Sequence, residues 1–155
     1  MKYDDASWHY GGEFAKDLPP EAGATHIGMF LAWAAASGLL GELHTDDDPD
    51  LLGKLLDRSM TPGAWFIVAC DEKFTDEDLN AEGNAFAATY YIDGETPDPA
   101  APKYLAEYCD VFSQFDDVYR VPDSWESFER LKPLLDKRFA DWKSPKPRGW
   151  RRFFQ

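Results

Sequence analysis

The chain has 155 residues, of which 44% are hydrophobic and 15% aromatic, which is enough apolar material for the core of one domain and excludes a disordered protein. Its formal net charge of −13 opposes binding to nucleic acid or an anionic membrane and favours a basic protein partner, although the same charge could serve only to keep the protein in solution. The N-terminus lacks the apolar stretch of a signal peptide, and the longest apolar segment, residues 27–40, is shorter than the roughly 20 residues of a membrane span, so we expect a cytoplasmic protein.

The first twelve residues combine acidic, aromatic and histidine side chains with two glycines. The glycines at positions 11 and 12 predict a turn. We therefore expect an irregular N-terminal arm, with Trp8 and Tyr10 holding it against the core and His9 hydrogen-bonded to a nearby carboxylate or carbonyl group.

Two stretches of this region carry a family resemblance. Residues 3–12 read Tyr-Asp-Asp-Ala-Ser-Trp-His-Tyr-Gly-Gly, and residues 24–30 read Ala-Thr-His-Ile-Gly-Met-Phe. Both stretches resemble an uncharacterised bacterial family of small acidic cytoplasmic proteins, a domain of unknown function. Because that family has no assigned activity, the resemblance implies no catalytic residue.

Three helices are predicted between residues 25 and 72. Thr25 is a capping residue before about 15 residues whose apolar side chains nearly encircle the helix, so this helix belongs at the centre of the core. Asp48 followed by Pro49 is a cap with a first-turn proline, and the leucines after it recur on one face, which predicts a surface helix. The apolar run at residues 64–70 is too short for its period to decide whether residues 62–72 form a buried helix or a strand; we favour the helix.

Three further helical segments follow. Thr75 with Asp78, and Asp123 with Glu126, have the spacing of capping boxes that open two of them. Aromatic residues spaced on one face predict the third between residues 104 and 115.

The fold predicted from these segments is all-α, a single compact domain of about six helices spanning residues 1–143. Pro133 should kink or split the last helix, and residues 118–121 are the best candidate for extended chain. An α+β fold with a small sheet is the alternative.

Residues with the chemistry of a hydrolytic metal site or an acid/base pair occur near the N-terminus, at Asp4, Asp5, His9 and Glu13, which His26 or His44 could join. The sequence has no His-x-x-x-His, Cys-x-x-Cys, nucleophile elbow or phosphate-binding loop. We therefore assign no catalytic residue, no metal ligand and no cofactor. Cys70 and Cys109 lie in apolar segments, so we expect reduced thiols in the core.

The end of the chain reverses the charge. Residues 1–129 carry a balance of −20, whereas residues 130–155 carry +7. The basic aromatic tail, residues 144–155, is expected to dock on the acidic face of its own chain, because tethering raises its effective concentration. A protein partner, disorder, and nucleic acid or lipid binding are the alternatives.

The function that suits these features is a cytoplasmic protein-binding module, most concretely an immunity-type protein that neutralises a basic bacterial toxin through an acidic surface. A non-catalytic scaffold or regulatory domain is the first alternative. A metal-dependent or acid/base enzyme using the N-terminal cluster is the second and less expected one. The oligomeric state stays open. The residues expected to contact the partner are exposed acids and their neighbours: Asp4, Asp5, Trp8, His9, Asp46, Asp47, Asp48, Asp116 and Asp117.

Overall fold

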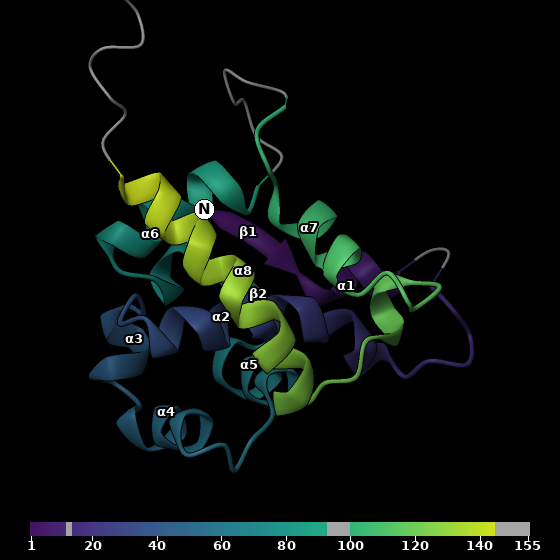
Figure 1. Ribbon diagram of the computed structural model, residues 1–155. Helices are drawn as coiled ribbons and strands as arrows, with labels where there is room; N and C mark the ends of the chain where they lie inside the picture. The colour runs from purple at the N-terminus through teal and green to yellow at the C-terminus, as the bar shows by residue number, and fades with distance from the viewer. Residues whose placement is uncertain (12–13, 93–99, 145–155) are drawn as a thin grey trace, which may run out of the picture.

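The computed structural model describes residues 1–11, 14–92 and 100–144, and within these ranges it is mostly α-helical (Figure 1). The eight α-helices of this part are α1 (Ala6–Tyr10), α2 (Thr25–Ala36), α3 (Glu42–Thr45), α4 (Pro49–Leu56), α5 (Pro62–Cys70), α6 (Ala81–Tyr90), α7 (Tyr104–Val111) and α8 (Trp125–Lys143). The remaining elements are strands β1 (Lys2–Asp5) and β2 (Lys73–Thr75) and the 3-10 helices η1 (Pro20–Ala24), η2 (Asp76–Asp78) and η3 (Val118–Arg120). The predicted all-α class is confirmed, with more helices than expected and one small sheet. The predicted docking of the tail falls on residues 145–155, outside the described residues.

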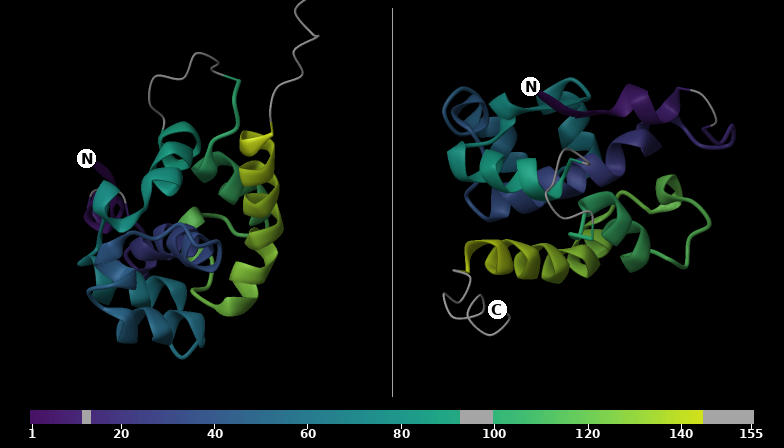
Figure 2. Two further views of the ribbon diagram at one scale, coloured as in Figure 1. Left: turned by 90° about the vertical axis from the view of Figure 1, so that its left-hand side faces the viewer. Right: turned by 90° about the horizontal axis from the view of Figure 1, so that it is seen from above.

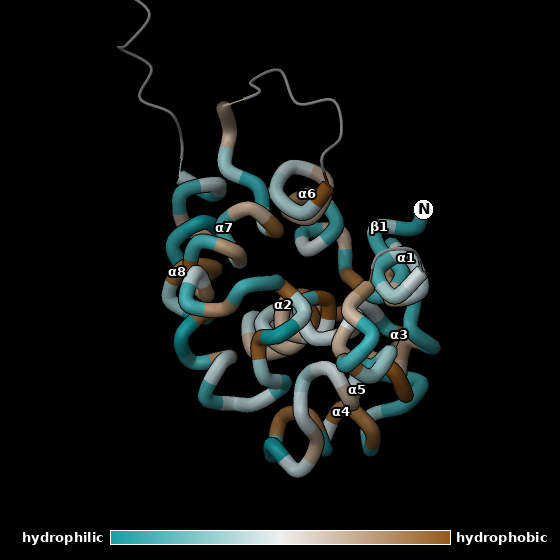
Figure 3. The backbone as a smooth tube through the Cα atoms, turned by 90° about the vertical axis from the view of Figure 1, so that its right-hand side faces the viewer, coloured by the Kyte–Doolittle hydropathy of each residue, from teal (hydrophilic) through white to brown (hydrophobic). Residues whose placement is uncertain are grey.

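Helix α2 forms the centre of the molecule, as its nearly continuous apolar surface predicts. Each of its first ten residues is buried. Figure 3 shows hydrophobic stretches gathered around α2, α4 and α5 and hydrophilic ones along the outside. Figure 2 shows α7 and α8 as a separate layer beside the elements of the N-terminal half. None of the helices in the described ranges is both long and apolar enough to cross a membrane.

Helix α5 packs closely against α2, and glycine permits that approach. A Cβ atom added to Gly28 would lie 2.4 Å from the carbonyl oxygen of Pro62 and 2.7 Å from the backbone nitrogen of Gly63. The start of α5 is held by Thr61, which accepts a hydrogen bond from the backbone N–H of Ala64, and by the carboxylate of Asp123. The preferred prediction of a helix in residues 62–72 is confirmed, and this helix ends at Cys70.

Aromatic side chains fill the space between α2 and the outer helices. The ring of Phe30 lies 4.9 Å from Tyr91 and 5.2 Å from Tyr104, centroid to centroid, in edge-on contacts. Trp33 packs 5.5 Å from Phe139 of α8 and donates its indole N–H to Asp136 at 2.9 Å. The indole N–H of this buried ring is thus satisfied by an exposed side chain of α8.

The N-terminal arm is regular, and the expectation of an irregular arm is wrong. Strand β1 pairs antiparallel with β2, with Lys2 opposite Thr75 and Asp4 opposite Phe74, and a bulge lies between these pairs. A bulge breaks the strict alternation of faces along a strand. Tyr3 and Asp4 are accordingly both buried.

Four details of the sequence-based helix predictions are wrong. Thr25 is the first residue of α2 and not its cap, because η1 leads directly into the helix. Pro133 does not split α8, which continues through it. Residues 118–120 form η3 in place of extended chain. Asp123 does not cap α8; that cap is Ser124, and Asp123 hydrogen-bonds to the start of α5.

Two capping predictions are confirmed or refined. Asp48 caps α4, which lies at the surface and buries Leu55. Thr75 and Asp78 form a complete capping box, but the box opens η2. The following α-helix, α6, has its own cap at Asn80.

Two glycine-to-alanine substitutions test the packing of α2 against α5. Gly28→Ala should lower the free energy of unfolding by about 2–3 kcal/mol, because its methyl group would meet backbone atoms that cannot move aside. Gly53→Ala, in α4, is the matched control: nothing lies within 4 Å of its added Cβ, so it should raise stability by about 1 kcal/mol. Urea unfolding followed by circular dichroism measures both, and equal effects would contradict the close contact.

Candidate functional site

A buried polar cluster lies where β1, α1 and α2 meet. Asp4 comes from the end of the strand, His9 from the short helix that follows it, and His26 from the second position of α2. One side-chain nitrogen or oxygen from each of the three residues lies within 4.8 Å of the others. Within the described part of the chain, this is one of two places where such side chains converge so closely.

The carboxylate of Asp4 is the centre of the cluster. Its Oδ1 lies 2.7 Å from Nε2 of His9 and accepts the backbone N–H of Asp5 at 2.8 Å. Its Oδ2 accepts the hydroxyl of Tyr91 at 2.6 Å. On the far side of the imidazole, Nδ1 of His9 lies 2.8 Å from the hydroxyl of Tyr119. The charged group is therefore well supplied with hydrogen bonds, as a buried carboxylate requires.

His26 is different, because neither of its ring nitrogens has a hydrogen-bond partner among the described residues. Its Nε2 lies 3.4 Å from Oδ2 of Asp4, near enough for electrostatic attraction but without hydrogen-bond geometry. The side chain is only 2% exposed, and its ring meets that of His9 edge-on at 4.4 Å between centroids. A buried, unpaired imidazole is uncommon and needs an explanation.

The cluster has a defined charge pattern. Burial opposes ionisation of Asp4, but the polar contacts with His26, His9 and Tyr91 outweigh it and hold the pKa of Asp4 below its ordinary value. Burial lowers the pKa of His26, against the opposing pull of Asp4. Burial and the Asp4 charge raise the pKa of Tyr91 well above its ordinary range. At neutral pH the site thus holds one carboxylate, a neutral His26 and a protonated Tyr91 that can donate to it.

Two cavities flank the cluster. One, of about 160 Å³, is lined by Asp4, His26 and Tyr91 together with the exposed side chains of Trp8 and Leu105. It connects the carboxylate and the unpaired imidazole with the surface.

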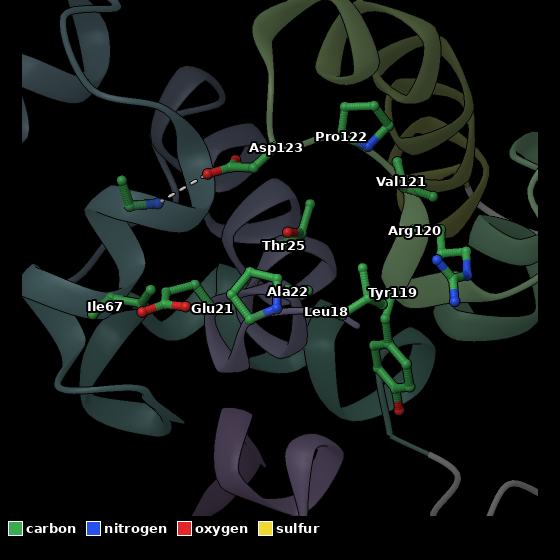
Figure 4. Close-up of a pocket in the computed structure, with 12 residues that line it drawn as sticks. Leu18, Glu21, Ala22, Thr25, Ile67, Tyr119, Arg120, Val121, Pro122 and Asp123 are labelled. Atoms are coloured by element: carbon green, nitrogen blue, oxygen red, sulfur yellow. Dashed lines mark hydrogen bonds between the residues drawn. The ribbon is translucent and has the colours of Figure 1, made fainter. Parts of the chain in front are cut away.

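The second cavity, of about 410 Å³, touches the surroundings of the cluster at Thr25 and Tyr119 and is shown in Figure 4. The ring of Tyr119 lines it, while the hydroxyl of the same residue bonds to His9. Thr25, the residue before His26, also faces it. Asp123 lies at its edge, where its carboxylate accepts the backbone N–H of Ala64 at 3.2 Å.

The predicted N-terminal cluster is formed in part. Asp4 and His9 come together, and His26 joins them, whereas His44 lies in a separate cluster. Asp5 does not belong to the site, because its carboxylate caps α1 through Ser7 and pairs with Lys2 at 2.9 Å. Glu13 lies outside the described residues.

The expectation that the acids of the arm are exposed is wrong. Asp4 is 7% and Asp5 is 5% exposed, because the sheet and the hydrogen bonds described above draw both carboxylates inward. Trp8 does not hold the arm against the core, since it is 58% exposed and lies under the ammonium group of Lys2. The prediction that His9 hydrogen-bonds to a carboxylate is confirmed.

The other predicted contact residues lie at the surface in two separate places. Asp46, Asp47 and Asp48 are exposed between α3 and α4. Asp116 is exposed and Asp117 half-buried in the segment before η3. Figure 1 shows α3 and α4 on the opposite side of the molecule from α1 and this segment, so the predicted residues do not form one continuous face.

A shallow groove of about 620 Å³ runs beside the first of these places. We call it the acidic groove; Glu42, Leu43, Asp47, Glu77 and Leu79 line it. The three acids are exposed, and Leu43 is 41% exposed. None of its described lining residues is a lysine, arginine or histidine.

The second convergence of side chains consists of His44, Asp78 and Cys70. Nε2 of His44 lies 2.8 Å from Oδ1 of Asp78, whose Oδ2 accepts the backbone N–H of Thr75 in the capping box. Burial raises the pKa of the Cys70 thiol, so the sulfur stays protonated. Both cysteines are free, as expected, but Cys109 is exposed and the expectation that it lies in the core is wrong.

Tyr91 and Tyr119 are the site residues that sequence reasoning missed. They lie 87 and 110 residues from Asp4 and His9, the groups they bond. No local spacing links positions so far apart. The available signal was indirect, since a tyrosine placed in a core needs a partner for its hydroxyl.

A substitution at the centre of the cluster tests its contribution to stability. Asp4→Asn should lower the free energy of unfolding by about 2 kcal/mol or more, because the amide brings donors to where His9 and Tyr91 need a charged acceptor. Asp116→Asn removes the same charge at an exposed position and should change stability by less than about 0.5 kcal/mol. Urea unfolding compares the two variants. An Asp4→Asn variant as stable as the native chain would show that the hydrogen-bond network contributes nothing to stability.

Comparison with protein-family models matches residues 2–121 to the Domain of unknown function (DUF7832). Comparisons with the curated proteins and with the solved structures found no match. The matched range contains Asp4, His9, His26 and both tyrosines, together with the acidic groove, and ends before α8. The chain therefore belongs to the DUF7832 family of domains of unknown function.

Proposed function

We propose that this chain is a protein-binding module of the bacterial cytoplasm that engages a basic partner through the acidic groove. The observation that carries the proposal is the composition of the groove: three exposed carboxylates, from Glu42, Asp47 and Glu77, surround the exposed Leu43, and no described lining residue is cationic. Within the described part of the chain, no cation of the lining compensates this negative charge.

The partner that fits is a protein segment carrying arginine or lysine beside an apolar side chain. The cationic heads would meet the carboxylates, and their aliphatic stems or a neighbouring apolar residue would cover Leu43. The net charge of −13 would speed encounter with such a partner, while the apolar contact would slow its dissociation. The same charge disfavours nucleic acid and anionic membranes as partners.

The most specific form of this proposal is an immunity protein that neutralises a basic toxin. The family resemblance of the N-terminal segment and the acidic surface both suit it. A scaffold or regulatory domain without a toxin partner would use the same groove, and the identity of the bound protein separates the two forms.

A metal-dependent or acid/base enzyme is the second candidate, and one observation favours it. Asp4 and His9 converge with His26 at the end of a cavity that opens to the surface, as an enzyme site requires.

A pair of charge-neutralising variants tests the binding proposal. The groove variant is Glu42→Gln/Asp47→Asn/Glu77→Gln, and the matched control is Asp110→Asn/Asp116→Asn/Glu126→Gln, which removes three exposed acids elsewhere. A basic protein captured from the source cells by the native chain is purified and titrated against all three forms by biolayer interferometry at low and high salt. The groove variant should bind at least about ten-fold more weakly and the control nearly as well as the native chain.

Equal losses in the two variants would contradict the proposal, because they would show that total charge alone drives binding. An unchanged affinity of the groove variant would place the interface elsewhere. Thermal unfolding of each variant verifies that the substitutions leave the fold intact.

A further inference from the structure

The strongest unexplained feature outside the acidic groove is the unpaired His26. Its two ring nitrogens are buried, and neither has a hydrogen-bond partner among the described residues. The ring nevertheless lines the 160 Å³ cavity, and its Nε2 is directed to within 3.4 Å of the Asp4 carboxylate. Leaving a buried polar group unpaired costs about 1–3 kcal/mol. A ligand that accepts the imidazole lone pair would remove that cost.

The chemistry of the three convergent groups is that of a cation site. Two imidazole nitrogens and one carboxylate come from three elements, β1, α1 and α2, and lie within 4.8 Å of one another. Two histidines with one carboxylate hold iron(II) or zinc ions and leave other coordination positions open. The single negative charge of Asp4 would partly balance a divalent ion.

The distances allow such an ion. Two ligand atoms about 2.1 Å from a tetrahedral Zn²⁺ lie about 3.4 Å apart. The separation of His26 Nε2 from Asp4 Oδ2 is 3.4 Å. The separation of His9 Nε2 from Asp4 Oδ1 is 2.7 Å, so a small rotation of the half-buried His9 side chain would be needed.

The surrounding groups are those that orient metal ligands. A histidine that binds a metal through Nε2 usually donates its Nδ1–H to an oxygen, and Nδ1 of His9 lies 2.8 Å from the hydroxyl of Tyr119. The Asp4 carboxylate is held in place by Tyr91 and by the backbone N–H of Asp5. The cavity beside Asp4 and His26 leaves room for water or a small molecule at the open positions.

We propose that Asp4, His9 and His26 bind one first-row divalent transition-metal ion, zinc or iron(II), with at least one coordination position open to the cavity. The cluster of His44, Asp78 and Cys70 is a built-in comparison. There the carboxylate completes a capping box, Nε2 of the histidine bonds to that carboxylate, and the thiol is protonated, so these three groups already serve structural contacts.

Metal titration of the full chain tests this site. Protein stripped with a chelator is titrated with Zn²⁺ by calorimetry and with Co²⁺ by visible absorption, and elemental analysis gives the stoichiometry. We expect one ion per chain. His9→Gln and Asp4→Asn should each weaken binding at least ten-fold, and Tyr119→Phe should weaken it about ten-fold without changing the stoichiometry.

His44→Gln is the matched control, because it removes an imidazole from the comparison cluster and should leave the affinity unchanged. Nitrogen-15 NMR of the histidine rings supplies a second readout: on binding, the proton of His9 should move from Nε2 to Nδ1. His26→Gln is included as a further variant and should also weaken binding. Circular dichroism and thermal unfolding without metal show which variants are folded. If His26→Gln does not fold, the test rests on His9→Gln, because the His9 side chain is only half-buried.

Three results would overturn the proposal. The first is a chain that binds neither ion at millimolar concentration, which would leave a buried water as the partner of His26. The second is an affinity unchanged by His9→Gln in a folded protein. The third is an equal loss of binding in His44→Gln.

Discussion

The contact between α2 and α5 at Gly28 is the constraint on which the rest of the structure depends. Because no side chain separates the helices there, α2 lies deep enough for each residue from Thr25 to Ala34 to be buried. This depth fixes His26, which lies two residues before Gly28 and is carried into the interior with the helix. Burying an imidazole is therefore a consequence of helix packing, and the surrounding chain must supply groups that tolerate it.

The groups around His26 show how a fold accommodates one buried charge. The Asp4 carboxylate enters the core from a bulged strand, and four elements contribute to its surroundings: α1 through His9, α2 through His26, the end of α6 through Tyr91, and η3 through Tyr119. Isolated, the carboxylate would be strongly destabilising at this depth. Hydrogen bonds from His9, Tyr91 and the backbone N–H of Asp5 offset that cost, whereas the ring nitrogens of His26 have no hydrogen-bond partner among the described residues.

Features of the fold that depend on neighbouring residues could be predicted from the sequence, whereas features that depend on contacts between distant residues could not. The core helix, the cap at Asp48, the start of α5 and the capping box at Thr75 depend on neighbouring residues, and the sequence predicts them. Strand pairing between residues 2–5 and 73–75 is a long-range event with only four and three residues per strand, so periodicity could not reveal it. Asp123 shows the same limit: its spacing fits a cap for α8, but the tertiary fold brings it to α5.

The candidate site was only half predictable for the same reason. Asp4 and His9 are close in sequence, and their residue types suggested acid/base or metal chemistry, whereas Tyr91 and Tyr119 could be placed only by the fold. The structure also separates two groups of acids that the sequence analysis assigned to the same partner-binding surface. The acidity of the arm is internal and serves the polar cluster, while the acidity near α3 is external and serves the acidic groove. Because the two lie on different elements, a partner could occupy the groove without displacing a ligand from Asp4, and each proposal can fail without the other.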